Sequence, residues 1–307
     1  MTAPMPLILD VDTGTDDALA LAYAHANPHI ELVAVSTVAG NIGVDLATAN
    51  TLAVLDYIGA SNVPVHRGAS HPLCRPHRDA VYFHHENGMG GAKLPASNRE
   101  IGPDRGPAAM IRLAKQRPGE ITLVCLGPLT NLAIALNVEP GITDLLAGVA
   151  LMGGAYNVPG NTTPAAEFNI LVDPEAAEQV FAAPFKHLIA VGLDVTEQVR
   201  LTTEDWKHAV ANAASLNPTA ALLGEVGRFA YGELGRDSFA LHDPLAVASA
   251  LRPDLISRED AAIVVETTDG DALGRTRIVG PGRIGVALAV HAERALRDFR
   301  ETVGLPA

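Results

Sequence analysis

The sequence predicts an α/β fold in which an open, mostly parallel sheet is flanked by helices. Short, almost continuously apolar runs alternate with helical patterns, which is typical of parallel strands that are covered on both faces. Polar residues gather where several of these runs end, at the edge where open α/β sheets bind ligands. No internal repeat or low-complexity linker interrupts the pattern, so we expect residues 1–307 to form a single domain.

The individual elements follow from the apolar runs and from helical spacing. We expect strands at Leu7–Asp12, Leu32–Val38, Val63–His66, Ile121–Leu126, Val149–Met152 and Leu188–Gly192. We expect helices at Asp16–Ala26, Asp45–Ile58, Pro107–Gln116, Leu129–Leu136, Pro174–Ala183 and Thr203–Ala213. The C-terminal part shows strand-like Ala262–Glu266 and Arg275–Val279 and a charged helix from His291 to about Thr302, an expected edge addition to the sheet. The Gly-, Pro- and His-rich segment Gly68–Arg105 predicts a functional or mobile loop.

Composition limits the class of protein. Hydrophobic residues make up 48% of the 307 residues and the mean hydropathy is +0.18, which excludes a disordered chain. The net charge of −13 argues against nucleic-acid and anionic-membrane partners, since both call for basic patches. The two cysteines, Cys74 and Cys125, form no CxxC pair and indicate neither a thiolate zinc site nor a disulfide framework. Because no secretory signal or membrane-spanning run is recognisable, we expect a cytoplasmic protein.

Four carboxylates lie in one short run near the start of the chain: Asp10, Asp12, Asp16 and Asp17. We interpret the run as a strand that ends at Asp12, a tight turn at Gly14 and a helix that starts near Asp16. Acids in the first turn of a helix are favourable by themselves, but this does not explain Asp12 at the end of an apolar strand. Because carboxylates so close together repel one another, the run indicates a hard divalent cation bound through oxygen.

Other polar motifs also follow expected strands or open expected helices. They are Val38-Ala39-Gly40-Asn41, Leu126-Gly127-Pro128-Leu129-Thr130-Asn131, Met152-Gly153-Gly154, Gly160-Asn161, Glu167-Phe168-Asn169 and His242-Asp243-Pro244-Leu245. Each motif alone is explained by a turn or a helix cap; Asp243, for example, suits an N-cap before proline. Their common placement at the carboxyl ends of the strands favours one shared pocket.

Taken together, these motifs resemble the inosine-uridine-preferring nucleoside hydrolase family. The resemblance runs from residue 9 to about 250, and the N-terminal acidic run combined with the distant His242-Asp243-Pro244-Leu245 is highly specific. It implies the Rossmann-like nucleoside hydrolase fold and calcium-dependent hydrolysis of the N-glycosidic bond of ribonucleosides to free base and ribose, a purine or pyrimidine salvage reaction. It also implies a homo-oligomer, either a dimer or a tetramer. The small-molecule partner that the resemblance implies is a nucleoside substrate.

The resemblance further implies which residues bind the metal and activate water. The calcium ligands would be Asp12, Asp17, Asp243 and the backbone carbonyl of Leu126. Asp12 would be the general base that activates a metal-bound water, with Asn41 beside that water. Asp10 would support the loop from below.

Substrate-binding roles are implied in the same way. Asp16, Asn169 and Asp243 would hold the ribose 2′- and 3′-hydroxyls, whereas Asn161 and Glu167 would reach the 5′-hydroxyl. His84, Met152 and Phe168 would complete the substrate pocket, and His242 would assist the leaving base. Two departures from the family pattern are Thr13, where many members have proline, and His85, where glycine is common. Aromatic residues near Phe229 and Tyr231 would either stack on the base or pack between helices.

Two other functions fit parts of the sequence. Asp10-Val11-Asp12-Thr13 at a strand end resembles phosphohydrolases that use an aspartyl nucleophile and magnesium. That class leaves Asp16, Asp17 and the later amides unexplained, and the four lysines of the chain offer no evident phosphate-neutralising residue. A calcium-dependent nucleoside-binding protein without catalysis is the second alternative, and turnover separates it from an enzyme.

Overall fold

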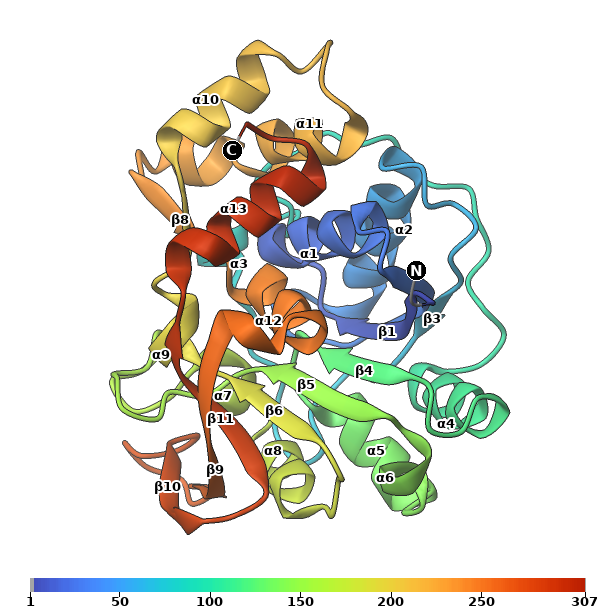
Figure 1. Cartoon of the computed structure of the whole chain (residues 1–307), viewed down its shortest axis with the longest axis vertical. Helices are drawn as coiled ribbons and strands as arrows, with labels where there is room; N and C mark the ends of the chain where they lie inside the picture. The colour runs from blue at the N-terminus through green and yellow to red at the C-terminus, as the bar shows by residue number, and fades with distance from the viewer. Residues whose placement is uncertain (1–2, 307) are drawn as a thin grey trace.

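A nine-stranded sheet forms the centre of the computed structural model, which describes residues 3–306 (Figure 1). The strands are β1 (Met5–Val11), β2 (Ile30–Thr37), β3 (Val65–Arg67), β4 (Thr122–Cys125), β5 (Gly148–Met152), β6 (Leu188–Val191), β9 (Ile256–Val265), β10 (Thr276–Pro281) and β11 (Ile284–Val290). Their order across the sheet is β10-β9-β11-β6-β5-β4-β1-β2-β3. All neighbours from β11 to β3 pair in parallel, whereas β9 and β10 join antiparallel. This confirms the predicted fold class and the predicted edge addition.

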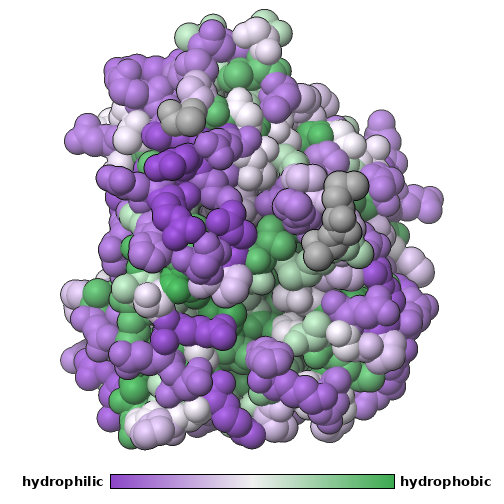
Figure 2. All heavy atoms as spheres, in the orientation of Figure 1, coloured by the Kyte–Doolittle hydropathy of each residue, from purple (hydrophilic) through white to green (hydrophobic). Residues whose placement is uncertain are grey.

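Helices cover both faces of the sheet because both faces are apolar (Figure 1). One core packs under α1 (Thr15–Ala26), α2 (Val44–Tyr57), α11 (Pro218–Val226), α12 (His242–Leu251) and α13 (Ala292–Val303). The other packs under α4 (Gly106–Gln116), α5 (Thr130–Val138), α6 (Ile142–Leu145) and α8 (Pro174–Ala182). Hydrophilic side chains cover most of the face seen in Figure 2. Within residues 3–306, no helix combines the length and the apolar character that a membrane crossing requires.

Short elements connect these layers. They are α3 (Val81–His84), α7 (Phe168–Val172), α9 (Leu193–Thr196), α10 (Thr203–Ala211), a π-helical turn (Arg228–Glu233), a 3₁₀ turn (Pro253–Leu255) and a separate hairpin of β7 (Arg200–Thr202) with β8 (Ser238–Ala240). The first six expected strands and all expected helices lie within two residues of the observed bounds. One expected bound near the C-terminus was wrong, since β9 begins at Ile256 rather than Ala262. Strand β11 was not predicted, although its sequence is an apolar run.

The chain order creates a switch point beside β1. After β1 the chain adds β2 and β3 on one side, and it later returns to place β4 on the other side. The loops after β1 and β4 therefore diverge, and open α/β sheets bind ligands in the crevice that such divergence leaves. Asp12 follows β1 directly and Leu126 follows β4 directly, so both lie at this crevice.

Candidate active site

A cavity of about 300 Å³ lies at the carboxyl ends of the parallel strands. Most residues predicted from the sequence line it: Asp16, Asn41, His84, Leu126, Met152, Asn161, Glu167, Phe168, Asn169, His242 and Asp243. Asp12 and Asp17 are fully buried and do not line the cavity wall. Segments that are more than two hundred residues apart in sequence thus form one pocket.

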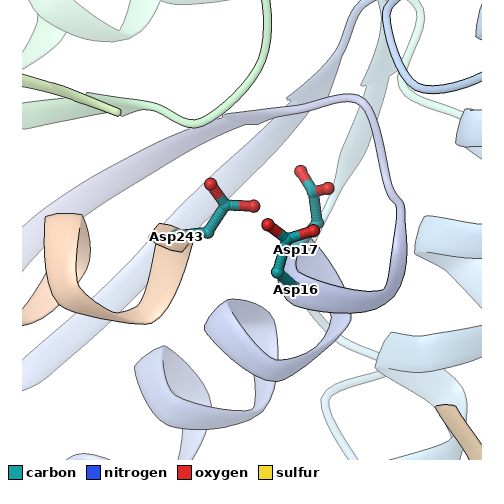
Figure 3. A group of neighbouring side chains, drawn as sticks. All are labelled: Asp16, Asp17 and Asp243. Carbon is teal, nitrogen blue, oxygen red and sulfur yellow. The ribbon is translucent and has the colours of Figure 1, made fainter. Parts of the chain in front are cut away.

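Three buried carboxylates converge beside this cavity. One oxygen from each of Asp16, Asp17 and Asp243 lies within 4.8 Å of the others. Asp16 and Asp17 project from the start of α1, and Asp243 reaches them from the first turn of α12 (Figure 3). Asp243 is not the N-cap of α12, because that position is Leu241. This group contains Asp16, to which the resemblance gives a ribose role, and it does not contain Asp12.

Asp12 is held at the bottom of the site by the loop after β2. The backbone N–H of Asn41 donates to Asp12 Oδ2 at 2.6 Å, and the Asn41 amide donates to Asp17 Oδ2 at 3.3 Å. Asp17 in turn accepts hydrogen bonds from the backbone N–H groups of Asp12 and Gly14. Asp12 Oδ1 is buried and has no hydrogen-bond partner among the described residues. Of the two carboxylate oxygens of Asp12, Oδ1 is therefore the one without a protein partner.

Gly40 allows the loop after β2 to approach Asp12. A Cβ at this position would overlap Asp12 Oδ2 and lie 2.6 Å from Pro128 Cδ. We expect Gly40→Ala to displace the carboxylate, to remove most activity and to lower the free energy of unfolding by about 1–3 kcal/mol. Gly43→Ala is the matched control, since a Cβ there meets nothing within 4 Å. Urea unfolding and initial rates of both variants test this; a fully active Gly40→Ala would contradict it.

A deeper carboxylate, Asp10, links several parts of the site. Its Oδ1 accepts hydrogen bonds from Ser36 Oγ at 2.6 Å and from Asn131 Nδ2 at 2.7 Å. Asn131 Nδ2 also donates to the Thr37 carbonyl, so this residue ties β1 and β2 to the start of α5. The N-cap position of α5 is Leu129, so neither Thr130 nor Asn131 is the helix cap that this motif alone would allow. Burial raises the pKa of Asp10 to about 7.

Burial and mutual repulsion make the carboxylate cluster costly without a counter-charge. Desolvation and the neighbouring Asp17 raise the pKa of Asp16 to about 8, and the same two causes raise the pKa of Asp12. The pKa of Asp243 is raised by burial and then by Asp16, Asp17 and Asp12. No arginine or lysine of residues 3–306 forms an ion pair with these groups.

The donor set fits a hard cation. It consists of carboxylate oxygens, and both Asp12 Oδ1 and Asp16 Oδ1 are buried without a partner in the described chain. Oxygen-only ligands suit calcium or magnesium better than zinc, which prefers nitrogen and sulfur. Leu126 lines the same cavity, and its carbonyl accepts a hydrogen bond from Asn169 Nδ2 at 2.7 Å.

Amide and carboxylate groups from the loop after β5 form the opposite wall. Glu167 caps α7 and accepts hydrogen bonds from the backbone N–H groups of Asn169, Ile170 and Gly154. Asn161 is exposed at the rim, and its Oδ1 accepts from the Phe168 N–H at 3.0 Å. The backbone thus fixes both polar side chains, while Asn161 Nδ2 and lone pairs of Glu167 remain available to a ligand.

Loop Gly68–Arg105 contributes His84 at the end of α3. His84 is 5% exposed, and its Nδ1 lies 3.2 Å from the Thr15 N–H and 3.0 Å from Thr15 Oγ1. The next residue, His85, has a φ of 67°, a conformation that favours glycine.

Burial lowers the pKa of His84 to about 3 from its ordinary value of 6.5. Below about pH 6.5 the imidazole of His84 is therefore protonated in the unfolded chain but still neutral in the folded protein. The free energy of unfolding falls as the pH drops below this value. His84→Asn keeps an acceptor for Thr15 but cannot bind this proton. Between about pH 6 and pH 4, we expect it to reduce the slope of the free energy of unfolding against pH by about 1.4 kcal/mol per pH unit. Urea unfolding with a chelator present measures this. The same change at exposed His25 is the control, and an unchanged slope in His84→Asn would refute the prediction.

His242 stands at the other side of the cavity, one residue before Asp243. Its Nδ1 lies 2.8 Å from Thr196 Oγ1, and its Nε2 lies 3.9 Å from a carboxylate oxygen of Glu197. Burial lowers the pKa of His242 to about 4, against the opposing effect of Glu197. The imidazole is therefore neutral at neutral pH and can donate one N–H hydrogen bond.

The sequence missed several residues that line the cavity: Ala80, Tyr82, Phe83, Thr162, Glu197 and Arg236. The Arg236 guanidinium stacks 4.4 Å above the Phe83 ring. Neither residue belongs to a motif with a chemical signature, so only the fold reveals them. Phe229 and Tyr231 do not line the cavity: Phe229 contacts His85, and Tyr231 stacks on Trp206. In this structure both residues pack against other aromatic rings.

Comparisons with known proteins find relatives over nearly the whole chain. A model of the inosine-uridine preferring nucleoside hydrolase family matches residues 7–297. The non-specific ribonucleoside hydrolase RihC of Salmonella agona strain SL483 is 38% identical over 311 residues, which cover 99% of this chain and 97% of RihC. Among solved structures, the plant nucleoside hydrolase PpNRh1 has a TM-score of 0.90 at 30% identity, covering 99% of this chain and 100% of its own. A purine-preferring ribonucleoside hydrolase from Gardnerella vaginalis has a TM-score of 0.89 at 32% identity, covering 97% and 98%.

Fold, pocket and relatives together define an enzyme of the ribonucleoside hydrolase class. The sequence and structure similarities extend over nearly the whole chain. The region that the family model matches includes every residue that lines the cavity. The chain belongs to the inosine-uridine preferring nucleoside hydrolase family.

Proposed function

We propose that this protein hydrolyses the N-glycosidic bond of ribonucleosides in a calcium-dependent reaction, with Asp12 as the general base. The observation that carries the proposal is the group of buried, mutually repelling carboxylates beside a cavity lined with amides. Asp12, Asp17, Asp243 and the Leu126 carbonyl would hold the ion, and the position of Asp16 makes it a further candidate ligand. A bound calcium ion supplies a counter-charge, orders the sugar diol and lowers the pKa of the attacking water.

The chain's own groups account for water activation. Hydrolysis of an N-glycosidic bond passes through an oxocarbenium-like state and needs a water on the face opposite the leaving base. Asp12 Oδ2 is engaged by the Asn41 N–H, which leaves Oδ1 to accept the proton of the water. Asn41 lines the cavity and would contact the same water.

Ribose recognition falls to the polar groups around the acidic cluster. Asp16, Asn169 and Asp243 would bind the 2′- and 3′-hydroxyls, and Asn161 and Glu167 the 5′-hydroxyl. The buried carboxylate of Glu167 would repel a 5′-phosphate, which favours nucleosides over nucleotides. Such contacts accelerate the reaction to the extent that they strengthen in the transition state.

Other lining residues would surround the base. Met152, Phe168 and His84 would contact it or the sugar, and His242 would assist its departure. We also propose that the chain works as one catalytic domain and assembles into a dimer or tetramer.

Release of reducing sugar from a panel of purine and pyrimidine ribonucleosides tests the proposed activity. We expect release from at least one ribonucleoside and none from the matching 5′-monophosphate. Release of inorganic phosphate instead would support the phosphohydrolase alternative, and binding without turnover would support a nucleoside-binding protein.

Metal dependence gives a separate prediction. Calcium at about 100 times its dissociation constant should stabilise the chelator-treated protein by about 2.7 kcal/mol, because the ion binds only the folded state. Asp243→Asn should abolish most of this gain, which thermal unfolding with and without calcium measures. Asp173→Asn is the matched control: Asp173 is also buried, but it accepts hydrogen bonds from Thr130 and Ala176 away from the cluster. A wild-type protein that calcium fails to stabilise would refute the calcium site.

A further inference from the structure

Thr196 is the only residue of the described chain that hydrogen-bonds to His242 Nδ1, and the proposed function gives it no role. Thr196 is the last residue of α9 and is fully buried. Its Oγ1 lies 2.8 Å from His242 Nδ1. His242 is at the cavity and Thr196 is behind it, so the threonine cannot contact a substrate directly.

The contact determines which ring nitrogen carries the proton. A buried hydroxyl needs an acceptor for its hydrogen, and Nδ1 is the only partner of Thr196 Oγ1 among the described residues. The hydroxyl therefore donates to Nδ1, which places the imidazole proton on Nε2. The carboxylate of Glu197, 3.9 Å from Nε2, favours a proton on the same nitrogen.

Backbone hydrogen bonds fix the positions of Thr196 and His242 relative to each other. Thr196 follows β6 through the short helix α9, and its N–H donates to the Gly192 carbonyl at 3.1 Å. The Leu241 N–H donates to the Val199 carbonyl at 2.8 Å, which joins the segment before His242 to the segment after Thr196. The β7–β8 pairing extends this connection. The hydroxyl and the ring thus meet in a geometry that exists before substrate binds, as a preorganised site requires.

We propose that Thr196 is a positioning residue that holds His242 as the Nε2–H tautomer, with this N–H directed into the cavity where the nucleobase departs. The proposal rests on the proposed function, because it assigns His242 to the leaving base. A neutral histidine with the opposite tautomer would present a lone pair to the base and could not donate to it.

The test compares two variants on two substrates. Thr196→Val removes the hydroxyl at nearly constant shape, whereas Thr196→Ser keeps it. On inosine, whose base needs a hydrogen bond or proton to leave, we expect Thr196→Val to lower kcat by about tenfold or more and Thr196→Ser to restore most of it. On p-nitrophenyl riboside, whose leaving group needs no proton, both variants should stay within about twofold of wild type. Adding Thr196→Val to His242→Ala should cause no further loss on inosine, since the two residues act as a unit.

Equal losses on both substrates, or wild-type kcat on inosine, would overturn the positioning role. If the wild-type protein hydrolyses no ribonucleoside of the panel, the proposed function itself fails, so the two failures are distinguishable. Long-range ¹H–¹⁵N spectra of the histidine rings test the tautomer without any change at Thr196. The spectrum of His242→Gln should lack the ring signals of one of the 11 histidines, which assigns those signals to His242. In the wild-type spectrum, these signals should show a proton on Nε2. A proton on Nδ1 would refute the proposal.

Discussion

Asp12→Asn should lower kcat by about 10²–10⁴-fold while leaving the protein folded. The Asn41 N–H needs an acceptor, so the new side chain will turn its oxygen toward Asn41 as Asp12 Oδ2 does now. The amide nitrogen then occupies the position of Oδ1, where it cannot accept a proton from water. The variant also removes one charge from a cluster whose members raise each other's pKa, so the metal-free protein should become more stable.

Steady-state rates at saturating calcium, together with thermal unfolding in chelator, measure both effects. Saturating calcium separates loss of the base from loss of the ion. Ser36→Ala is a useful control, because it removes a hydrogen bond to buried Asp10 without touching Asp12. Near-native kcat in calcium-loaded Asp12→Asn would refute the general-base role.

The sequence was sufficient for the architecture because each central strand is a continuous apolar run. Buried strands of a parallel sheet need apolar side chains on both faces, so the ends of each apolar run predict the ends of the strand. The same signal was present in β11 and was missed. The start of β9 was placed too late because residues 257–260 are polar and exposed.

The candidate site was predictable where chemistry demands rare residue combinations, as in the acidic run before α1. It was not predictable where contacts join residues far apart in the chain. Asn131 meets Asp10 across 121 positions, and Arg236 meets Phe83 across the cavity mouth. The composition of the acidic cluster also needed coordinates, because the sequence does not show that the carboxylates within 4.8 Å of Asp243 are those of Asp16 and Asp17 and not that of Asp12.

His242→Ala should reduce the hydrolysis of inosine by about 10²–10⁴-fold, the usual range for assistance by a positioned acid or donor. The nucleobase leaves as an anion or receives help, and His242 is the only histidine of the described chain that both lines the cavity and precedes a carboxylate of the cluster. Its ring is held by Thr196 on one side and faces Glu197 on the other.

The same variant should hydrolyse p-nitrophenyl riboside at nearly the wild-type rate, since p-nitrophenolate leaves without a proton. A histidine that merely fills space beside the start of α12 would predict equal losses on both substrates, because a displaced Asp243 disturbs the ion and the ribose whatever the leaving group. Comparing kcat on the two substrates in one variant, at saturating calcium, decides between these roles. An equal loss would remove His242 from the catalytic residues and leave departure of the base to its own stability as an anion.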